Sequence, residues 1–309
     1  MGPTASGKTA LALALAHYLP VEIISVDSAL IYREMDIGTA KPDRATRQLI
    51  PHRLVDILDP AEAYSAGQFR ADALREIAQI HRMGRVPLLV GGTMLYFRAL
   101  TQGLSQLPSA DPAVRARLAL ELTEQGNAAL HARLAGVDPI AAERIHPHDP
   151  QRVQRALEVY EITGQSLTEL CALPRDESLP WPMIKLIVAP ADRPWLHKRI
   201  EQRWRDMLEQ GFIDEVARLR SRGDLDLDKP SMRAVGYRQV WQYLAGDLDY
   251  AALNERALIA TRQLAKRQMT WLRAESDAQW LESADPDLLE KSLNRLRAQG
   301  FFLKGADGL

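Results

Sequence analysis

Several absences restrict what this chain can be. The 309 residues include one cysteine, Cys171, so no disulfide can form within the chain and a cytoplasmic, reducing location is expected. No apolar run approaches the length of a membrane span, so no membrane contact is expected. The 39 basic and 40 acidic residues nearly cancel, so a nucleic acid would have to be held by a local basic patch.

Common catalytic and metal-binding motifs are missing as well. The seven histidines show no HExxH or other zinc spacing, and His146 and His148, which flank Pro147, are interpreted as structural residues of a turn. Nothing resembles G-x-S-x-G, so a serine nucleophile cannot be argued. The sequence therefore gives no support to a zinc enzyme or a serine hydrolase.

One motif is present in full. Residues 2–9, GPTASGKT, match the phosphate-binding pattern G-x-x-x-x-G-K-[ST] and lead into a predicted helix over residues 9–18. Such a loop points successive N–H groups into an anion-sized hollow at the positive end of the helix. Lys8 adds a cation over the terminal phosphates, and the Thr9 hydroxyl is placed to hold Mg²⁺. A signal peptide, a myristoylation site and a plain glycine turn are the alternatives, and the following helix favours the phosphate loop.

The strand that normally feeds such a loop is not in the sequence, because only Met1 precedes Gly2. We therefore expect an apolar strand upstream of the residues given. Three short apolar runs are predicted to be buried parallel strands: residues 22–26, 86–90 and, with the weakest pattern, 52–57. Residues 65–83 have helical periodicity, with Ser65 as the cap. This alternation predicts an open parallel sheet with helices on both faces.

The strand pattern stops near Pro108. Residues 111–170 are predicted to form consecutive short helices, interrupted at Gly126, Gly136, Asp138–Pro139 and residues 146–150. Two later strands are predicted, at residues 183–188 and 279–281, within a mainly helical remainder from residue 193 to 300. The predicted fold is α/β: a phosphate-loop NTPase-like core of residues 1–110 and 181–309, carrying an all-helical insertion domain of residues 111–180.

Asp27 follows the predicted strand 22–26 at the ligand side of the sheet, where the loop 91–93 should also lie. Three roles are open to it. It could hold Mg²⁺ through water, act as a general base, or cap a helix together with Ser28. The sequence alone does not choose among them.

A stretch near the end of the chain has the local excess of positive charge that RNA binding would need. Between residues 256 and 273 there is no acidic residue, and Arg262, Lys266 and Arg273 lie nearly on one helical face. Residues 151–155 and 233–239 have a similar makeup of Arg and Gln, with Tyr237 available for base stacking. A solvated helix surface is the alternative for each.

Six ordered segments together identify a family resemblance: residues 2–9, 25–42, 88–100, 151–164, 233–241 and 261–273. In these segments, which are spread along the chain almost from end to end, the sequence resembles the bacterial tRNA dimethylallyltransferases, also called tRNA isopentenyltransferases. The resemblance implies transfer of a dimethylallyl group from dimethylallyl diphosphate to N6 of the adenine 3′ of the anticodon, position 37. Although this loop is typical of ATP-binding proteins, the donor in this family is a prenyl diphosphate.

The resemblance also implies roles for individual residues, with Mg²⁺ as cofactor and the tRNA anticodon stem-loop as partner. We expect the protein to be a monomer. The diphosphate would bind Gly2, Thr4, Ala5, Ser6, Gly7, Lys8 and Thr9, with Thr9 at the metal. Catalysis would involve Asp27, Lys8 and Thr93. Contacts with tRNA would come from Asp27, Ser28, Ala29, Leu30, Thr93, Arg115, Gln151, Arg152, Val153, Gln154, Arg155, Arg233, Ala234, Val235, Gly236, Tyr237, Arg238, Lys266, Arg267, Gln268, Met269, Thr270, Trp271, Leu272 and Arg273.

Two other classes of function are compatible with the motifs. A nucleotide or small-molecule kinase would use the same loop and sheet for phosphoryl transfer. An RNA-binding protein without catalytic activity would use the loop to sense a nucleotide.

Overall fold

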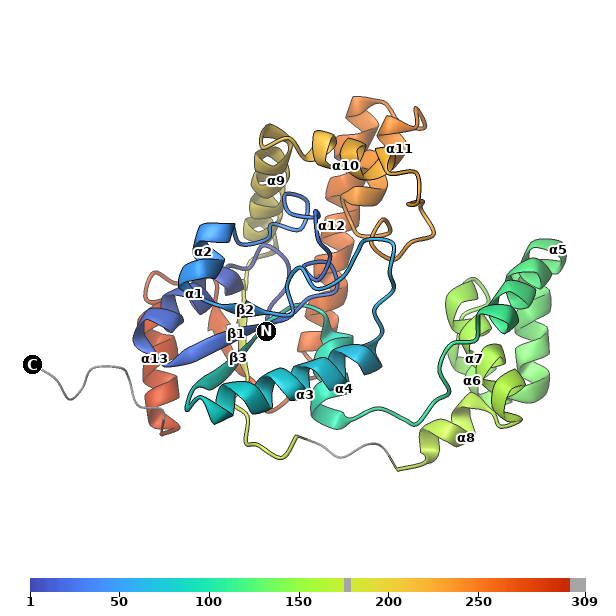
Figure 1. The fold of residues 1–309 in the computed structure, drawn as a ribbon, viewed down its shortest axis with the longest axis horizontal. Coiled ribbons are helices and arrows are strands. Elements are labelled where there is room, and N and C mark those ends of the chain that lie inside the picture. The colour runs from blue at the N-terminus through green and yellow to red at the C-terminus, as the bar shows by residue number, and fades with distance from the viewer. Residues whose placement is uncertain (175–178, 301–309) are drawn as a thin grey trace, which may run out of the picture. The chain divides into compact units, whose positions relative to one another are not determined.

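The computed structural model describes residues 1–174 and 179–300, which divide into two compact units (Figure 1). The first unit contains Met1–Ala99 and the chain from Trp181 onward, and the second contains Leu100–Pro180. The second unit begins at Leu100, whereas the predicted insertion began at residue 111.

The strands of the first unit are all parallel, as predicted. β1 (Val21–Val26) lies between β2 (His52–Arg53) and β3 (Val86–Gly91), and β4 (Leu186–Ala189) pairs with β5 (Gln279–Glu282). The strand predicted over residues 52–57 was too long. Leu54 and Asp56 have φ angles of 60° and 57°, which is the left-handed region and cannot continue a strand.

The expected single sheet is present as two groups of strands, with the start of the chain between them. The Val188 N–H donates to the Met1 carbonyl at 2.9 Å, and the Met1 amine donates to the Leu186 carbonyl at 2.8 Å. On the other side, a Cβ placed on Gly92 would lie 3.0 Å from the Gly2 oxygen. Residues 1–2 therefore pass between β4 and the end of β3. The upstream strand stays a prediction.

The helices in the described part of the first unit are α1 (Lys8–Tyr18), α2 (Arg44–Leu49), α3 (Ala66–Arg82), α4 (Met94–Gln102), which continues into the second unit, α9 (Arg193–Glu209), α10 (Phe212–Ser221), α11 (Tyr237–Leu244), α12 (Tyr250–Leu272) and α13 (Leu288–Ala298). α1 packs through Leu15 into the apolar cluster that includes Val21 of β1. Glu22 points to the opposite face of the sheet, where it binds Arg53, which also binds Glu76 of α3. α1 and α3 thus cover opposite faces, as the alternation of strands and helices predicted.

The start of α3 confirms the predicted cap. The Ser65 hydroxyl accepts from the Gln68 N–H at 3.1 Å, and the Gln68 side chain accepts from the Ser65 N–H at 2.8 Å. This reciprocal pair satisfies two backbone donors at the helix end. Four residues at helical spacing, Phe69, Ala73, Ile77 and Ile80, form its buried face.

The helices in the described part of the second unit are the end of α4 and α5 (Pro112–Val137), α6 (Pro139–Arg144), α7 (Pro150–Thr163) and α8 (Leu167–Ala172). Gly126 interrupts α5, with a φ of 80° and ψ of 171°. The interruption predicted at Gly136 is wrong, because the helix continues until Asp138, which caps α6. None of the helices in the described part of the chain has the length and apolar character that crossing a membrane requires.

A buried carboxylate connects α10 and α11 to the loop that follows β1. Glu215 accepts the N–H groups of Asp36, Ile37 and Gly38 at 3.0, 2.7 and 3.2 Å. The Tyr237 hydroxyl donates to the same carboxylate at 2.5 Å, and burial together with the Glu215 charge raises the pKa of Tyr237. One side chain therefore satisfies four donors inside the protein.

We predict that Glu215→Ala lowers the free energy of unfolding by about 3 kcal/mol, because these donors lose their common acceptor in a buried site. Chemical denaturation measures the change. Asp214→Ala is the matched control, since Asp214 is exposed on the same turn of α10, and its loss should cost less than about 1 kcal/mol. Equal effects of the two substitutions would contradict the structural role of Glu215.

Candidate active site

The loop before α1 has the backbone conformation that its sequence predicts. Gly7 has a φ of 90° and Ala5 a φ of 61°, so the chain turns sharply twice before the helix begins at Lys8. No side chain caps this helix, so its first N–H groups are left for a ligand. At the other end, a Cβ on Gly2 would lie 2.4 Å from the Val188 oxygen. Only glycine fits there.

The Lys8 ammonium group lies inside this loop and donates to the Pro3 carbonyl at 3.3 Å. Burial lowers the pKa of Lys8 to about 8; the negative charge of Asp27 opposes this shift, and the positive charge of Arg203 adds to it. A bound anion would stabilise the charged form of Lys8, which burial disfavours. Lys8 is therefore placed to gain stabilisation when phosphate enters.

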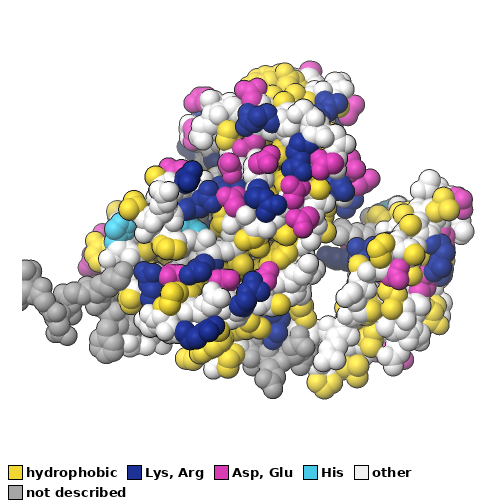
Figure 2. Space-filling model, in the orientation of Figure 1, with side chains coloured by type: hydrophobic (Ala, Val, Ile, Leu, Met, Phe, Trp, Pro, Cys, Tyr) yellow, Lys and Arg dark blue, Asp and Glu magenta, His cyan; other side chains and the backbone are white. Residues whose placement is uncertain are grey.

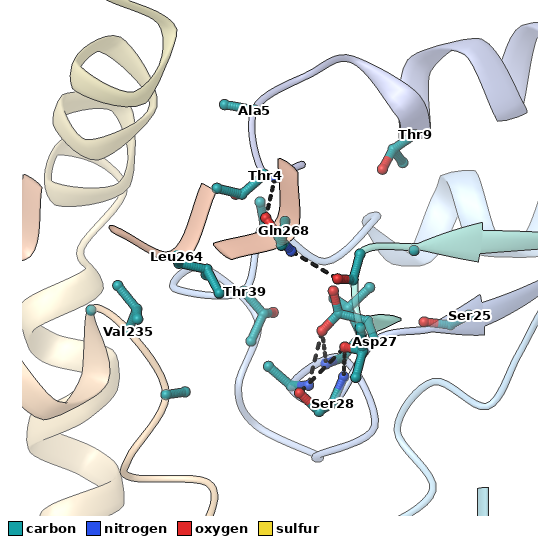
Figure 3. A pocket seen from close by; sticks show the side chains of 18 of the residues that line it. Thr4, Ala5, Thr9, Ser25, Asp27, Ser28, Thr39, Val235, Leu264 and Gln268 are labelled. Atoms are coloured by element: carbon teal, nitrogen blue, oxygen red, sulfur yellow. Dashed lines mark hydrogen bonds between the residues drawn. The ribbon is translucent and has the colours of Figure 1, made fainter. Parts of the chain in front are cut away.

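A cavity of about 560 Å³ opens in front of the loop (Figure 3). Three groups of side chains line it. The phosphate loop contributes Thr4, Ala5, Lys8 and Thr9; the ends of β1 and β3 contribute Ser25, Asp27, Ser28, Gly92 and Thr93; the helical side contributes Arg203, Trp204, Met207, Val235, Leu264, Arg267, Gln268 and Trp271. Gly2 and Ser6, also predicted to bind phosphate, are buried and are not among the lining residues.

Asp27 lies where β1 ends, as predicted. Its Oδ1 accepts the N–H groups of Ala29 and Leu30 at 2.9 and 3.4 Å, which closes a turn. No helix starts here, because the next one, α2, begins at Arg44, so the helix-cap interpretation is wrong. Oδ2 accepts no hydrogen bond within the part of the chain that the structure describes. The carboxylate is thus held by one oxygen and keeps the other for a ligand.

Thr93 holds the ends of β1 and β3 together. Its Oγ1 accepts from the Ser28 N–H at 3.1 Å, and its own N–H donates to the Val26 carbonyl at 3.2 Å. The parallel register pairs Val26 with Gly91, so the residues that follow each strand meet at one edge. The predicted meeting of Asp27 with the loop 91–93 is confirmed.

Arg203 is a cavity residue that the sequence did not indicate. It extends from α9, and its guanidinium donates to the Thr39 carbonyl at 3.3 Å. Burial lowers the pKa of Arg203, and the charge of Asp27 opposes that shift. The helix carries so many charged residues that its sequence resembles a solvated surface. No spacing rule distinguishes Arg203 from its exposed neighbours.

The basic residues of α12 divide into paired and unpaired ones. Arg262 binds Glu201 at 2.5 Å, so it does not belong to a free cationic face. Lys266, Arg267 and Arg273 are exposed and make no ion pair within the residues described. On the face of the molecule drawn in Figure 2, by contrast, basic and acidic side chains alternate over the first unit.

Three of the residues predicted to contact tRNA have buried side chains. Tyr237 and Leu272 are 0% exposed and Val153 is 1% exposed. The Tyr237 ring packs edge-on against Phe212 and its hydroxyl binds Glu215, so the proposed stacking of Tyr237 on a base is wrong. These three side chains pack in the interior. The basic residues around them in the sequence led to the prediction of an RNA contact.

In the second unit, Glu158 binds two of the arginines predicted to contact tRNA. Arg115 donates to it at 2.8 Å and Arg155 at 2.6 Å, and the Arg155 guanidinium also donates to the Pro108 carbonyl at 2.7 Å. Gln151 and Arg152 are exposed. Arg115 and residues 151–155 belong to the second unit, whereas the lining residues of the cavity belong to the first.

The remaining predicted contacts lie on the first unit. Ala234, Val235 and Gly236 line the cavity. Arg233 lines it too and binds Asp228 at 3.2 Å, while Arg238 is exposed. No cluster of three or more metal-ligating His, Cys, Asp or Glu side chains occurs among the residues described.

Comparisons with known proteins identify the family. A family model described as IPP transferase matches residues 30–275. A tRNA dimethylallyltransferase of Alkalilimnicola ehrlichii is 65% identical over 275 residues, which cover 89% of this chain and 86% of that protein. The chain belongs to the tRNA dimethylallyltransferase family.

Solved structures of tRNA isopentenyl- and dimethylallyltransferases share the fold. The enzyme of Bacillus halodurans is 36% identical, with a TM-score of 0.70 over 97% of this chain and 94% of its own. The enzyme of Staphylococcus epidermidis is 32% identical, with a TM-score of 0.68 over 97% of both chains. A eukaryotic dimethylallyltransferase acting on tRNA is 26% identical, with a TM-score of 0.80 over 99% of this chain and 80% of its own.

The lowered pKa of Lys8 predicts an alkaline limit to donor use. Lys8 is protonated below about pH 8 and loses its charge as the pH rises through that value, so kcat/KM for the diphosphate donor should fall about tenfold per unit above it. In Lys8→Arg the charge persists, and this limb should disappear even if the maximum rate is lower. Steady-state kinetics between pH 6 and about 10 at saturating tRNA measure this.

The control is Lys291→Arg, which changes an exposed lysine paired with Asp285 and should keep the limb. A wild-type profile that stays level to about pH 10 would show that the Lys8 charge does not govern donor binding.

Proposed function

We propose that this protein transfers a dimethylallyl group from dimethylallyl diphosphate to N6 of the adenine 3′ of the anticodon, position 37, and releases diphosphate. Dimethylallyl transfer to tRNA is the activity of the family to which it belongs. One observation supports the detailed assignment: the phosphate loop, a free carboxylate oxygen of Asp27 and an apolar wall line the same cavity. These are the three features that the donor and the acceptor base need.

The diphosphate would bind at the start of α1, in a phosphate-loop NTPase-like core. The uncapped N–H groups of the helix and the Lys8 ammonium face the cavity, and Arg203 enters it from α9. As the allylic C–O bond breaks, negative charge grows on the departing diphosphate, and these fixed donors stabilise it where it develops. The loop would therefore serve a prenyl diphosphate, although it resembles that of ATP-binding proteins.

The five-carbon chain would lie against the apolar part of the cavity wall. Trp204, Met207 and Leu264 line the helical side, opposite the strand ends. Apolar walls exclude water from an allylic carbon that gains cationic character. This reduces hydrolysis of the donor and leaves the adenine amine as the nucleophile.

Asp27 would accept the proton of the attacking amine. The lone pair of the adenine amino group is shared with the ring, so the amine attacks well only when its proton is removed. The N6–C1 bond forms, the C1–O bond to diphosphate breaks, and the proton passes to Asp27 Oδ2. The turn that holds Oδ1 fixes the direction of the other oxygen.

The residues present also fit Mg²⁺. The hydroxyl groups of Thr9 and Ser25 and the Asp27 carboxylate line the cavity, and Ser25 Oγ is buried with no hydrogen-bond partner in the described part of the chain. Mg²⁺ is commonly held by one or two protein oxygens, water and substrate phosphates. When bound, it would neutralise charge on the diphosphate. Thr9 would hold it, with Ser25 and Asp27 binding its water ligands.

tRNA would bind as a flexed anticodon loop, because the target amine is inaccessible while its base is stacked. On the first unit the exposed cations of α12 and Arg238 would contact phosphates, and residues 27–30 would surround the base. Gln151 and Arg152 would add contacts from the second unit. Cytoplasmic location and a monomeric state remain predictions.

The proposed function is tested by incubating the protein with tRNA and labelled dimethylallyl diphosphate. We predict label on the RNA, at the adenine 3′ of the anticodon, and loss of label transfer when that adenine is replaced by guanine. A kinase would instead turn over ATP without tRNA, and an RNA-binding protein would retain tRNA without product. Either result would refute the proposal.

Asp27→Asn separates catalysis from binding in this assay. The asparagine keeps an oxygen for the Ala29 and Leu30 N–H groups but cannot take a proton, so turnover should fall at least about a hundredfold with tRNA affinity unchanged. The control, Glu209→Gln, removes an exposed carboxylate at the end of α9 and should leave turnover intact. Equal losses of affinity and turnover would assign Asp27 to binding.

A separate prediction concerns the exposed cations of α12 and the salt dependence of tRNA binding. If Lys266, Arg267 and Arg273 contact phosphates, replacing all three with Gln should flatten the slope of log K for tRNA against log salt by about two. Filter binding at several salt concentrations measures it. An unchanged slope would mean that this face is only solvated.

A further inference from the structure

Gln268 of α12 joins three segments that are far apart in the sequence. Its Oε1 accepts the Thr4 N–H at 2.8 Å, and its Nε2 donates to the Gly92 carbonyl at 3.0 Å (Figure 3). One amide therefore connects the phosphate loop to the end of β3 from the side of α12. Both ends of the amide are used, because the Thr4 N–H needs an acceptor and the Gly92 carbonyl needs a donor.

The backbone at Gly92 approaches this amide closely. A Cβ on Gly92 would lie 2.4 Å from Gln268 Nε2, so a side chain at that position would displace the amide. One turn away on the same helix, Ala265 is 2% exposed and packs in a cluster with Ala5 of the phosphate loop and with Ile200. α12 thus contacts the loop through an apolar residue and a hydrogen-bonded one.

The neighbours of Gln268 on the exposed side of α12 are the unpaired cations Lys266, Arg267 and Arg273. By sequence Gln268 belongs to the same basic stretch, and the resemblance assigned the whole stretch to tRNA. In the structure its amide oxygen accepts from the Thr4 N–H and its amide nitrogen donates to the Gly92 carbonyl, so the side chain is directed into the first unit. Gln268 therefore differs from these cations, because its amide is bound to the phosphate loop and to the end of β3.

We infer that Gln268 is a positioning residue for the diphosphate site and not a contact for tRNA. By holding Thr4 and Gly92 at a fixed separation, it sets the width of the hollow in which the diphosphate lies. The inference rests on the proposed function for the identity of the ligand, which is a diphosphate ester. On this inference, α12 would contact both the RNA and the loop that binds the donor.

The test measures binding of inorganic diphosphate with Mg²⁺ by calorimetry, without tRNA. Gln268→Met keeps the length and removes both hydrogen bonds, and we expect it to weaken diphosphate binding about tenfold. Affinity for an anticodon stem-loop should stay within about twofold of wild type. Gln263→Met is the matched control, because Gln263 is an exposed glutamine of the same helix, and it should change neither affinity.

A second variant covers the case in which Gln268→Met does not fold. Gln268→Glu still accepts from the Thr4 N–H but presents an oxygen to the Gly92 carbonyl, so it too should weaken diphosphate binding. Unchanged diphosphate affinity in a folded variant would overturn the inference, and weakened stem-loop binding alone would return Gln268 to the RNA interface. If the wild type bound diphosphate but transferred no prenyl group, the proposed function would fail while this inference remained open to the same binding test.

Discussion

The site depends on how residues 2–9 are held. The loop turns through positive φ at Ala5 and Gly7, and an isolated chain would not keep that conformation. Three external contacts fix it: the Arg199 guanidinium donates to the Ala5 carbonyl at 2.9 Å, Gln268 accepts from Thr4, and Met1 pairs with β4. Helices from the end of the chain thus shape a motif at its beginning. The cavity exists because α9 and α12 close over the loop that they support.

Local signals in the sequence predicted the parts of this site that local physics determines. The glycine spacing of the loop, the Ser65 cap and the position of Asp27 after a buried strand each depend on neighbouring residues, and the structure has all three. The parallel strands were predictable from their apolar runs, although residues 54–57 leave the strand through left-handed backbone angles. The joining of distant strand ends followed from the general geometry of parallel sheets.

What could not be predicted are the contacts between distant segments. Arg203 lies in a helix whose charge pattern resembles a surface, and its place beside Asp27 depends on how α9 packs. Tyr237 lies in a segment with the composition of an RNA-binding surface, yet it is a core residue whose hydroxyl binds Glu215.

The charge of the cavity could not be predicted from the charge of the whole chain either. The whole chain is nearly neutral, but Asp27 is the only carboxylate among the described cavity residues, against Lys8, Arg203, Arg233 and Arg267. This local imbalance suits an anion. Burial is the main cause of the lowered pKa of Lys8, and the charge of Arg203 adds to it.

The central claim is that the start of α1 holds the diphosphate while Asp27 faces the amine. The most direct test is a crystal structure with Mg²⁺, an unreactive thio-analogue of dimethylallyl diphosphate and an anticodon stem-loop. We predict the diphosphate on the loop of residues 4–9, with the adenine N6 within about 3.5 Å of the Asp27 carboxylate. A diphosphate found elsewhere, or an adenine amine out of reach of Asp27, would contradict it.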